Sequence, residues 1–444
     1  MIRLAERYVI REYDSFTYNE KSKAVNLIHI SEKLFNALET FILENKSNSS
    51  DALELLSVGS KKGVGKIISA KNYVGVICMN DGTTIEILPK IFNSIDDNYG
   101  RVRSILLEML RHATNIPVKV FNHATLKTEH TNIYEIFISM FIEEVTILYK
   151  RGLKSGYIEK RENVSFCKGH ILFSEQIKHN YIHKEKFFVE YDSFEINRSE
   201  NRLIKSTLRY LLGMTQDKKN KQDICRLINM FSDIDESVNI DFDFSNTKID
   251  RNMQLYEKIM QWCRVFLKKE SFTSFYGSTI SNAILFPMDK VFESYVAYMF
   301  SKFIDRKQYC CTAQDRGYYL FEVPKKKFRL RPDIVLRNKQ ACEHQLIIDT
   351  KWKLLLDEKR NFGISQSDMY QMYAYGKKYN TEHIVLLYPE NGVHDNEIEY
   401  VSNDNIYVKI CFIDLSNPKA SIIDIINWYY KLLNENSKKK EYTV

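Results

Sequence analysis

The stretch from Phe328 to Lys353 constrains the fold most, because its alternating pattern predicts two strands joined by a polar turn. The turn is expected at Asn338 to His344. Side chains two apart on a strand share a face, so Asp349 and Lys351 point the same way. If the two strands pair as a hairpin, Asp333 of the first strand comes near both. The pattern therefore predicts two carboxylates and one ammonium on one face of a sheet.

This set of side chains suits a metal-dependent reaction on phosphate. Mg²⁺ prefers hard oxygen ligands, and it is usually held by one or two carboxylates together with substrate phosphates and water. A nearby lysine can orient the attacking water or stabilise developing charge. Pro332-Asp333, fifteen further residues, and Asp349-Thr350-Lys351 resemble the PD-(D/E)xK nuclease signature. The alternative is a solvated strand edge, because Asp-x-Lys is a common sequence.

Two flanking helices favour the nuclease interpretation. The segment Ser365 to Tyr379 has helical periodicity, and it places Gln371 and Tyr375 four residues apart on one face. A Q-x-x-x-Y helix after the D-x-K strand resembles the RecB-type branch of these nucleases. Upstream, Pro287 to Asp305 predicts a helix with Glu293 at the border of its apolar stripe. Glu293 is thus a candidate third metal ligand beside the two aspartates, with a plain surface glutamate as the alternative.

Candidate DNA contacts lie on the same elements. Arg329 and Arg331 fall on the predicted strand face that carries Asp333, where they would contact the DNA backbone without sequence specificity. Tyr375 is a third predicted DNA contact. The net charge of +7, from 64 basic and 57 acidic residues, permits nucleic-acid binding without requiring it.

Composition indicates a globular cytoplasmic protein. No run of apolar residues reaches transmembrane length, and the first residues lack the apolar core of a signal peptide. The eight cysteines include no C-x-x-C pair, so no zinc site is expected. The segment Gly59 to Lys66 (GSKKGVGK) is not a Walker A motif, because its spacing is one residue too long and Ile67 follows the lysine. We expect a flexible basic loop there.

Hydrophobic periodicity predicts a mixed α/β protein (α+β) of several domains. We expect a β-rich amino-terminal domain at 1–120, a helical middle region at 121–280 and a PD-(D/E)xK core at 281–436, with a central mixed sheet flanked by helices. Residues 437–444 are expected to form a disordered tail.

Several segments, taken in order, resemble McrC, the nuclease subunit of McrBC-type modification-dependent (type IV) restriction systems. They are YVGVICMNDGTTIEILPKI (73–91), CKGHILFSEQI (167–177), YDSFEINRSENRLIKSTL (191–208), RPDIV, IDTKWK and DMYQMYAY. The resemblance implies a subunit of an antiviral restriction complex that cleaves double-stranded DNA with Mg²⁺ as cofactor. Which DNA modification is recognised, if any, does not follow from the resemblance. The resemblance also implies a hexameric AAA+ GTPase partner of the McrB type, on which the amino-terminal part docks and whose GTP hydrolysis it stimulates.

Carried over by position, Asp333, Asp349 and Lys351 take the metal-ligand and catalytic-lysine places, and Gln371 takes the helix position. Two other functions stay open. One is a catalytically silent adaptor that stimulates the AAA+ ring and binds DNA; the presence of all three core residues argues against it. The other is a stand-alone exonuclease of the RecB type, for which no helicase or iron–sulfur cysteine set is found.

Overall fold

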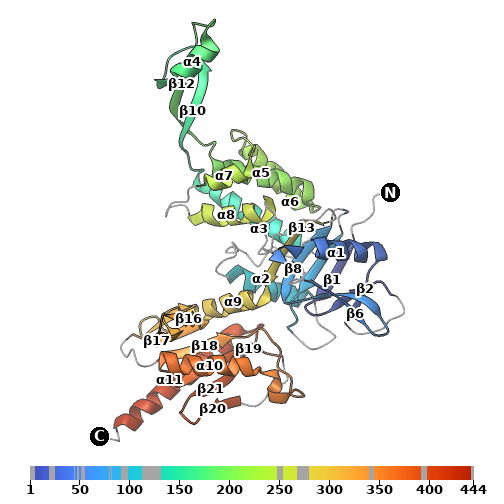
Figure 1. Cartoon of the computed structure of the whole chain (residues 1–444), viewed down its shortest axis with the longest axis vertical. Helices are drawn as coiled ribbons and strands as arrows, with labels where there is room; N and C mark the ends of the chain where they lie inside the picture. Colours follow the sequence, from blue (N-terminus) through green and yellow to red (C-terminus); the bar gives the residue numbers. More distant parts are fainter. Residues whose placement is uncertain are drawn as a thin grey trace. The chain divides into compact units, whose positions relative to one another are not determined.

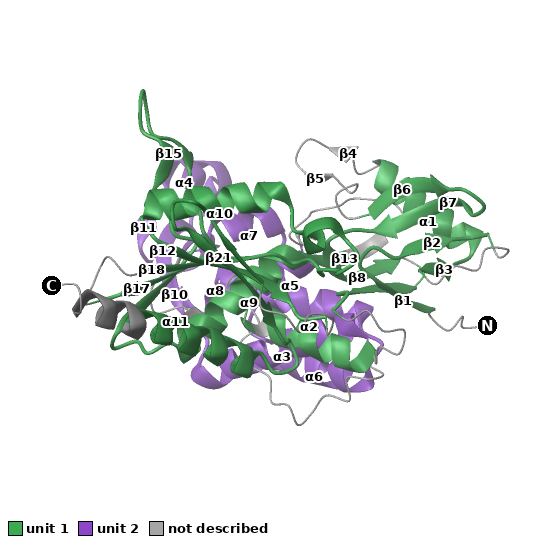
Figure 2. Cartoon of the chain, turned by 90° about the horizontal axis from the view of Figure 1, so that it is seen from below, with its two compact units in different colours: residues 1–119, 124–131, 275–444 green, residues 120–123, 132–274 purple. Residues whose placement is uncertain are grey.

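The structure is a computed structural model. It describes the 444-residue chain except for residues 1–5, 20–25, 45, 48–49, 52–55, 80, 82, 92–98, 113–131, 248–253, 268–279, 340–344, 392–397 and 442–444. The chain forms two compact units (Figure 2). Unit 1 comprises residues 1–119, 124–131 and 275–444, and unit 2 comprises residues 120–123 and 132–274. Among the described helices, none has the length and apolar content needed to cross a bilayer.

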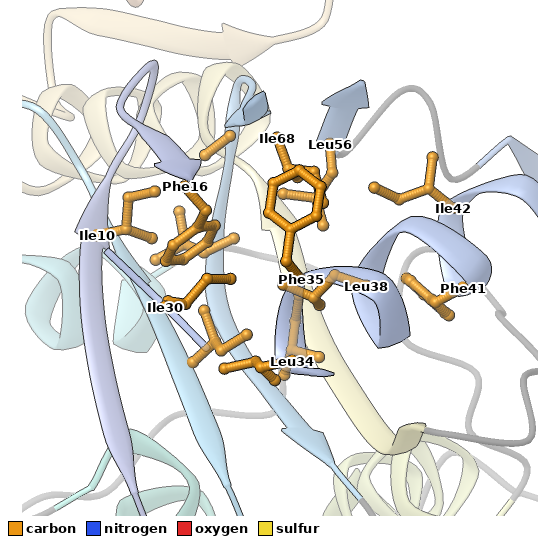
Figure 3. Close-up of a cluster of buried hydrophobic side chains, with 14 of the residues drawn as sticks. Ile10, Phe16, Ile30, Leu34, Phe35, Leu38, Phe41, Ile42, Leu56 and Ile68 are labelled. Carbon is orange, nitrogen blue, oxygen red and sulfur yellow. The ribbon is translucent and has the colours of Figure 1, made fainter. Parts of the chain in front are cut away.

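The amino-terminal part of unit 1 contains two four-stranded sheets and helix α1. The first sheet has the order β1 (Arg7–Arg11), β9 (Thr84–Leu88), β8 (Tyr73–Met79) and β13 (Ile280–Pro287). The second has the order β3 (Leu27–His29), β2 (Ser15–Thr17), β7 (Gly65–Ala70) and β6 (Leu56–Lys61). Helix α1 (Glu32–Glu44) follows Ser31, whose Oγ accepts a hydrogen bond from Leu34 N at 3.3 Å. Phe16, Phe35 and Ile68 belong to the buried apolar cluster between α1 and the strands (Figure 3).

The basic segment Gly59 to Lys66, expected as a loop, is the end of a β-hairpin: its first three residues belong to β6, its last two to β7, and residues 62–64 form the turn. Val64 N donates to Lys61 O at 3.0 Å, and Gly63 adopts a φ of 81°. A tight strand–strand turn does not lead into a helix, as a phosphate-binding loop would. The rejection of a Walker A motif is therefore consistent with the fold.

Strand β13 links the first sheet directly to the helix that carries Glu293. It pairs antiparallel with β8, ends at Pro287, and helix α9 (Met288–Phe303) begins at the next residue. Asn72 strengthens the junction, because its carbonyl accepts from Met288 N at 3.1 Å and its amide donates to Asp289 Oδ1 at 3.1 Å. Helix α2 (Tyr99–His112) packs against α9 in the same unit.

A six-stranded mixed sheet forms the carboxy-terminal part of unit 1, which we call the carboxy-terminal sheet domain. Its strand order is β14 (Tyr309–Ala313), β17 (Ile334–Asn338), β18 (Gln345–Thr350), β19 (His383–Pro389), β21 (Tyr407–Ile413) and β20 (Ile398–Val401). The β18–β19 and β19–β21 pairs are parallel and the others antiparallel. All six residues of β18 are buried, because helices cover both faces of the sheet.

The two faces of this sheet are covered by different helices. Helix α10 (Gln366–Tyr379) packs through Met372 and Tyr375 onto the face that carries Ile347. Ile348 points to the opposite face, and α9 and α11 (Pro418–Glu441) also contact the sheet. The predicted mixed fold, with a central sheet flanked by helices, is confirmed.

Two local predictions for this domain are corrected. The strand expected from Phe328 is broken: β16 (Lys327–Arg329) pairs with β15 (Tyr319–Phe321) in a separate small sheet, and β17 begins only at Ile334. Pro332 lies in the gap, where it cannot donate a ladder hydrogen bond. Of the turn expected at Asn338 to His344, residues 340–344 lie outside the described residues. The expected disordered tail is helical as far as Glu441, since α11 continues that far, and 442–444 lie outside the described residues.

Unit 2 combines a group of helices with a β arm (Figure 1). Its helices are α3 (Ile133–Arg151), α5 (Ser199–Met214), α6 (Lys218–Met230), α7 (Ile240–Ser245) and α8 (Gln254–Leu267). The arm consists of β10 (Gly156–Val164), β11 (His170–Ile171), α4 (Phe173–Asn180) and β12 (Phe187–Glu195). A helical middle region was expected at 121–280, and the structure adds the β arm to its helices. In the arm, all nine residues of β10 pair antiparallel with β12.

We predict that Gly75→Ala destabilises the protein by about 2 kcal/mol or more. Gly75 lies in β8 with a φ of 139°, and an added Cβ would overlap the carbonyl oxygen of Ile284 in β13. Gly59→Ala is the matched control, because a Cβ there meets only Ile67 Cγ1 at 3.9 Å. Chemical denaturation of both variants measures the effect. Equal unfolding free energies would contradict the described β8–β13 pairing.

Candidate functional site

The register of β17 and β18 brings the two predicted aspartates together. Ile334 pairs with Ile348, so Asp333, just before β17, and Asp349, just after Ile348, are neighbours across the hairpin. Thr350 fixes the Asp333 side chain: its backbone N donates to Asp333 Oδ2 at 2.8 Å, and its Oγ1 donates to the same oxygen at 2.7 Å. The predicted hairpin and its pair of carboxylates are therefore present.

Asp349 carries a buried carboxyl group whose pKa is raised well above its usual value. Only 1% of the residue is exposed. Burial raises the pKa of Asp349 to about 7, and the nearby charge of Asp333 adds to the increase. Its Oδ2 lies 2.6 Å from Lys351 Nζ and accepts no hydrogen bond from any other described residue. A buried acid in this state binds a cation favourably, because a cation offsets both the burial and the repulsion from Asp333.

Lys351 is held between a strand and a helix. Besides Asp349, its Nζ donates to Gln371 Oε1 of α10 at 3.2 Å. Burial is the largest single influence on the pKa of Lys351 and lowers it, but the contact with Asp349 and the charges of Asp368 and Asp333 together outweigh burial, so the pKa is raised. The lysine is therefore a cation in the metal-free protein. The structure confirms that Gln371 lies beside the predicted catalytic lysine.

Tyr375 does not occupy the position predicted for a DNA contact. Its side chain is 2% exposed, and its hydroxyl accepts a hydrogen bond from Gln371 Nε2 at 2.7 Å. Burial raises the pKa of Tyr375. The tyrosine thus orients the Gln371 amide, whose oxygen is left to face Lys351. Helical spacing predicted the shared face correctly, but that face points into the core.

Glu293 approaches the site from α9 through an intermediate side chain. It is 8% exposed, and its Oε2 accepts from Lys290 Nζ at 2.9 Å. Its Oε1 is in contact with Gln314 Nε2, and the same nitrogen lies 3.3 Å from Asp333 Oδ1. Burial, and then the charge of Asp333, raise the pKa of Glu293. Glu293 is therefore close to Asp333, with the Gln314 amide between the two acids.

Gln314 is a site residue that sequence reasoning missed. It follows β14 with a φ of 51°, and its backbone N donates to Asp333 O at 2.8 Å. The next residue, Asp315, fixes this turn: it accepts from Arg337 at 2.8 Å and from the hydroxyl of Tyr379 at 2.8 Å. No spacing rule links residue 314 to residue 333. Only the pairing of β14 with β17 brings them together.

The two predicted DNA-contacting arginines are not on the strand face that carries Asp333. Arg329 is exposed in β16, where its Nε donates to Arg316 O at 2.9 Å and its guanidinium lies over the ring of Tyr319. Arg331 is exposed in the segment between β16 and β17. The strand break corrects their placement, and their contact with DNA stays a prediction.

The acids fit a hard divalent cation held by few protein ligands. Asp333 and Asp349 supply carboxylate oxygens from adjacent strands, and Mg²⁺ commonly uses one or two carboxylates and completes its shell with water and phosphate. Within the described ranges, no set of three or more His, Cys, Asp or Glu side chains is placed to hold a metal ion. A third ligand from Glu293 would require the Gln314 amide to move. The geometry therefore suits a two-carboxylate site.

Comparison with known proteins gives a family and a fold. A family model described as "McrBC 5-methylcytosine restriction system component" matches residues 68–389, more than half of the chain. No curated protein matches. The fold is similar to a chain of a Thermococcus gammatolerans half-complex from a tetradecameric assembly of McrB AAA+ hexamers with bound McrC. That similarity has a TM-score of 0.65 and 18% identity, and it covers 94% of this chain and 100% of that one.

A second solved structure, the T. gammatolerans McrBC complex, is also 18% identical. It has a TM-score of 0.47 and covers 67% of this chain and 87% of that one. The family model matches a region that includes Asp333, Asp349, Lys351 and Gln371. The chain belongs to the family of McrBC 5-methylcytosine restriction system components, as the sequence resemblance to McrC predicts.

Proposed function

We propose that this chain is the DNA endonuclease subunit of an McrBC-type restriction complex, and that its carboxy-terminal sheet domain hydrolyses phosphodiesters in the manner of PD-(D/E)xK nucleases. The observation that carries this proposal is the contact of Lys351 Nζ with Asp349 Oδ2 at 2.6 Å, next to Asp333 on the paired strand. A solvated strand edge would not bury such a carboxylate at 1% exposure. The proposed substrate is double-stranded DNA, which places the reaction in the cytoplasm.

Each side chain has a definite task in this proposal. Asp333 and Asp349 hold Mg²⁺, and bound Mg²⁺ supplies a Lewis acid for the scissile phosphate. Lys351 positions the attacking water and stabilises negative charge that develops on the phosphate oxygens. Gln371 fixes the direction of the lysine ammonium through its 3.2 Å contact. Glu293 is the third candidate ligand, on the side of Asp333.

Metal binding tests this site without any need for activity. We predict that the full chain binds Mg²⁺ and Mn²⁺, and that Asp349→Asn weakens binding by about tenfold or more, because one of two carboxylate ligands is lost. Isothermal titration calorimetry with Mg²⁺ and electron paramagnetic resonance with Mn²⁺ measure it. Asp424→Asn, on the exposed surface of α11, is the matched control. Equal affinities of the two variants would exclude Asp349 as a ligand.

Cleavage of plasmid DNA tests the catalytic role of Lys351. With Mg²⁺, GTP and an AAA+ partner of the McrB type, we predict that Lys351→Ala slows cleavage by about a hundredfold or more. Lys353→Ala is the control, because its ammonium bonds to the Gly363 carbonyl outside the acid pair, and it should still cleave. Methylated and unmethylated plasmids are compared in parallel.

The same assay separates the nuclease from a silent adaptor. A nuclease subunit loses cleavage in Lys351→Ala but still stimulates GTP hydrolysis by the partner. If the unmodified chain stimulates GTP hydrolysis yet cuts no substrate, the adaptor function replaces our proposal. Cleavage that is independent of the partner would instead leave a nuclease that works alone.

We further propose that the β arm of unit 2 docks on the AAA+ partner. Tyr181 and Ile182 at one end of the arm are 80% and 84% exposed. Further large apolar side chains on the arm are more than 60% exposed: Tyr157, Phe166, Phe173, Ile177 and Phe194. Clusters of exposed apolar groups mark protein interfaces. The similar fold occurs in a complex of McrB hexamers with bound McrC, which supports a ring-shaped partner. The docking role expected for residues 1–120 stays a prediction.

We predict that Ile182→Asp weakens binding to the AAA+ partner by at least about tenfold, because an aspartate cannot be buried at an apolar interface without a partner charge. Val238→Asp is the control, since Val238 is fully exposed in unit 2 but lies outside the arm. Analytical ultracentrifugation with the partner and GTP measures complex formation. Equal binding by both variants would exclude this end of the arm from the interface.

A further inference from the structure

Trp352 connects the amino-terminal sheet to the candidate active site. Its indole Nε1 donates to Glu12 at 2.9 Å (Oε2) and 3.2 Å (Oε1), across 340 residues of sequence. Glu12 directly follows β1 and has no exposed surface. Its Oε2 also accepts from the backbone N of Lys90 at 3.1 Å. The carboxyl group therefore joins the first sheet to the segment that follows β18.

The position of Trp352 makes this contact relevant to catalysis. Trp352 is bonded to Lys351, and its ring packs on Phe292 with 5.2 Å between centroids. Phe292 in turn precedes Glu293 on α9. The indole N–H of Trp352 thus contacts Glu12 of the amino-terminal part. Its ring packs on the residue before Glu293, and its backbone is joined to Lys351.

The backbone at Lys351 has few other supports. Strand β18 ends at Thr350, and residues 351–356 form no regular element. Lys351 N donates to Leu387 O at 2.9 Å, and Lys353 N donates to Lys351 O at 3.0 Å. The Lys351 side chain must nevertheless keep its 2.6 Å contact with Asp349. A displacement of about 1 Å is enough to reduce a catalytic rate a hundredfold.

We propose that the Glu12–Trp352 hydrogen bond is a positioning contact, through which the amino-terminal sheet sets the place of Lys351 in the active site. This proposal rests on the nuclease function proposed above and adds a means of controlling it. Glu12 accepts hydrogen bonds from Trp352 Nε1 and from Lys90 N. Burial raises its pKa to about 8, which favours the neutral acid near pH 7. Glu12→Gln keeps an acceptor oxygen, whereas Glu12→Ala removes it.

The bond also lies at a surface pocket of about 420 Å³. Glu12 and Trp352 line this pocket together with Tyr13, Lys90, Lys353 and Lys359. A displacement of Glu12 would therefore shift Trp352, and with it the backbone of Lys351.

The test compares Glu12→Ala, Trp352→Phe, their double variant and Glu12→Gln in the full chain with its AAA+ partner. Trp352→Phe keeps a ring against Phe292 but loses the N–H donor. We expect the single-turnover cleavage rate to fall about tenfold to a hundredfold in Glu12→Ala and Trp352→Phe, with unchanged affinity for DNA. The double variant should be no slower than the slower single variant, and Glu12→Gln should restore the rate. Trp428→Phe on α11 is the control.

Hydrogen exchange of the chain alone gives a second measurement that needs no cleavage. We expect faster exchange at the amides of residues 351–355 in Glu12→Ala and Trp352→Phe, and wild-type exchange in Glu12→Gln. If the unmodified chain does not cut DNA, the nuclease proposal fails, and exchange alone decides whether the contact positions this segment. Additive losses in the double variant, a Glu12→Gln as slow as Glu12→Ala, or unchanged exchange would each overturn the inference.

Discussion

The antiparallel pairing of β17 with β18 is the constraint on which the candidate site depends. Because Ile334 pairs with Ile348, Asp333 and Asp349 become neighbours, and Thr350 can donate two hydrogen bonds to Asp333. A slip of one residue would turn Asp349 to the other face of the sheet. Helices cover both faces, so burial fixes the register. The same burial raises the pKa of Asp349 and makes the acid pair costly without a cation.

Elements around the hairpin complete the site from distant parts of unit 1. Helix α10 contributes Gln371, which Tyr375 orients from the core, and α9 contributes Glu293 next to the Gln314 amide. The amino-terminal sheet reaches the site by two routes: the continuous run of β13 into α9, and the bond from Trp352 to Glu12. The proposed catalytic residue Lys351 is therefore one residue away from a direct contact with the amino-terminal part of the chain.

Local patterns in the sequence predicted the parts of the site that lie on regular elements. Alternation predicted that Asp349 and Lys351 point the same way, and Lys351, the first residue after β18, does contact Asp349. Helical spacing placed Gln371 and Tyr375 together on α10. The pattern could not show that the first strand is interrupted at Pro332, which moves Arg329 away from Asp333. It also could not show that the face of α10 shared by Gln371 and Tyr375 is buried at Tyr375. Gln314 and Glu12 were missed because only tertiary pairing brings them to the site. The β arm of unit 2 was missed because only pairing with β12 makes a strand of the polar, basic segment after Gly152.

The most direct test of the account is the position of a bound metal ion. Crystals of the full chain grown with Mn²⁺ would locate it by anomalous scattering. We expect the ion at the site where Asp333 and Asp349 would hold it, beside Lys351. An ion bound elsewhere in the chain, with none at Asp333 and Asp349, would contradict the proposed nuclease site.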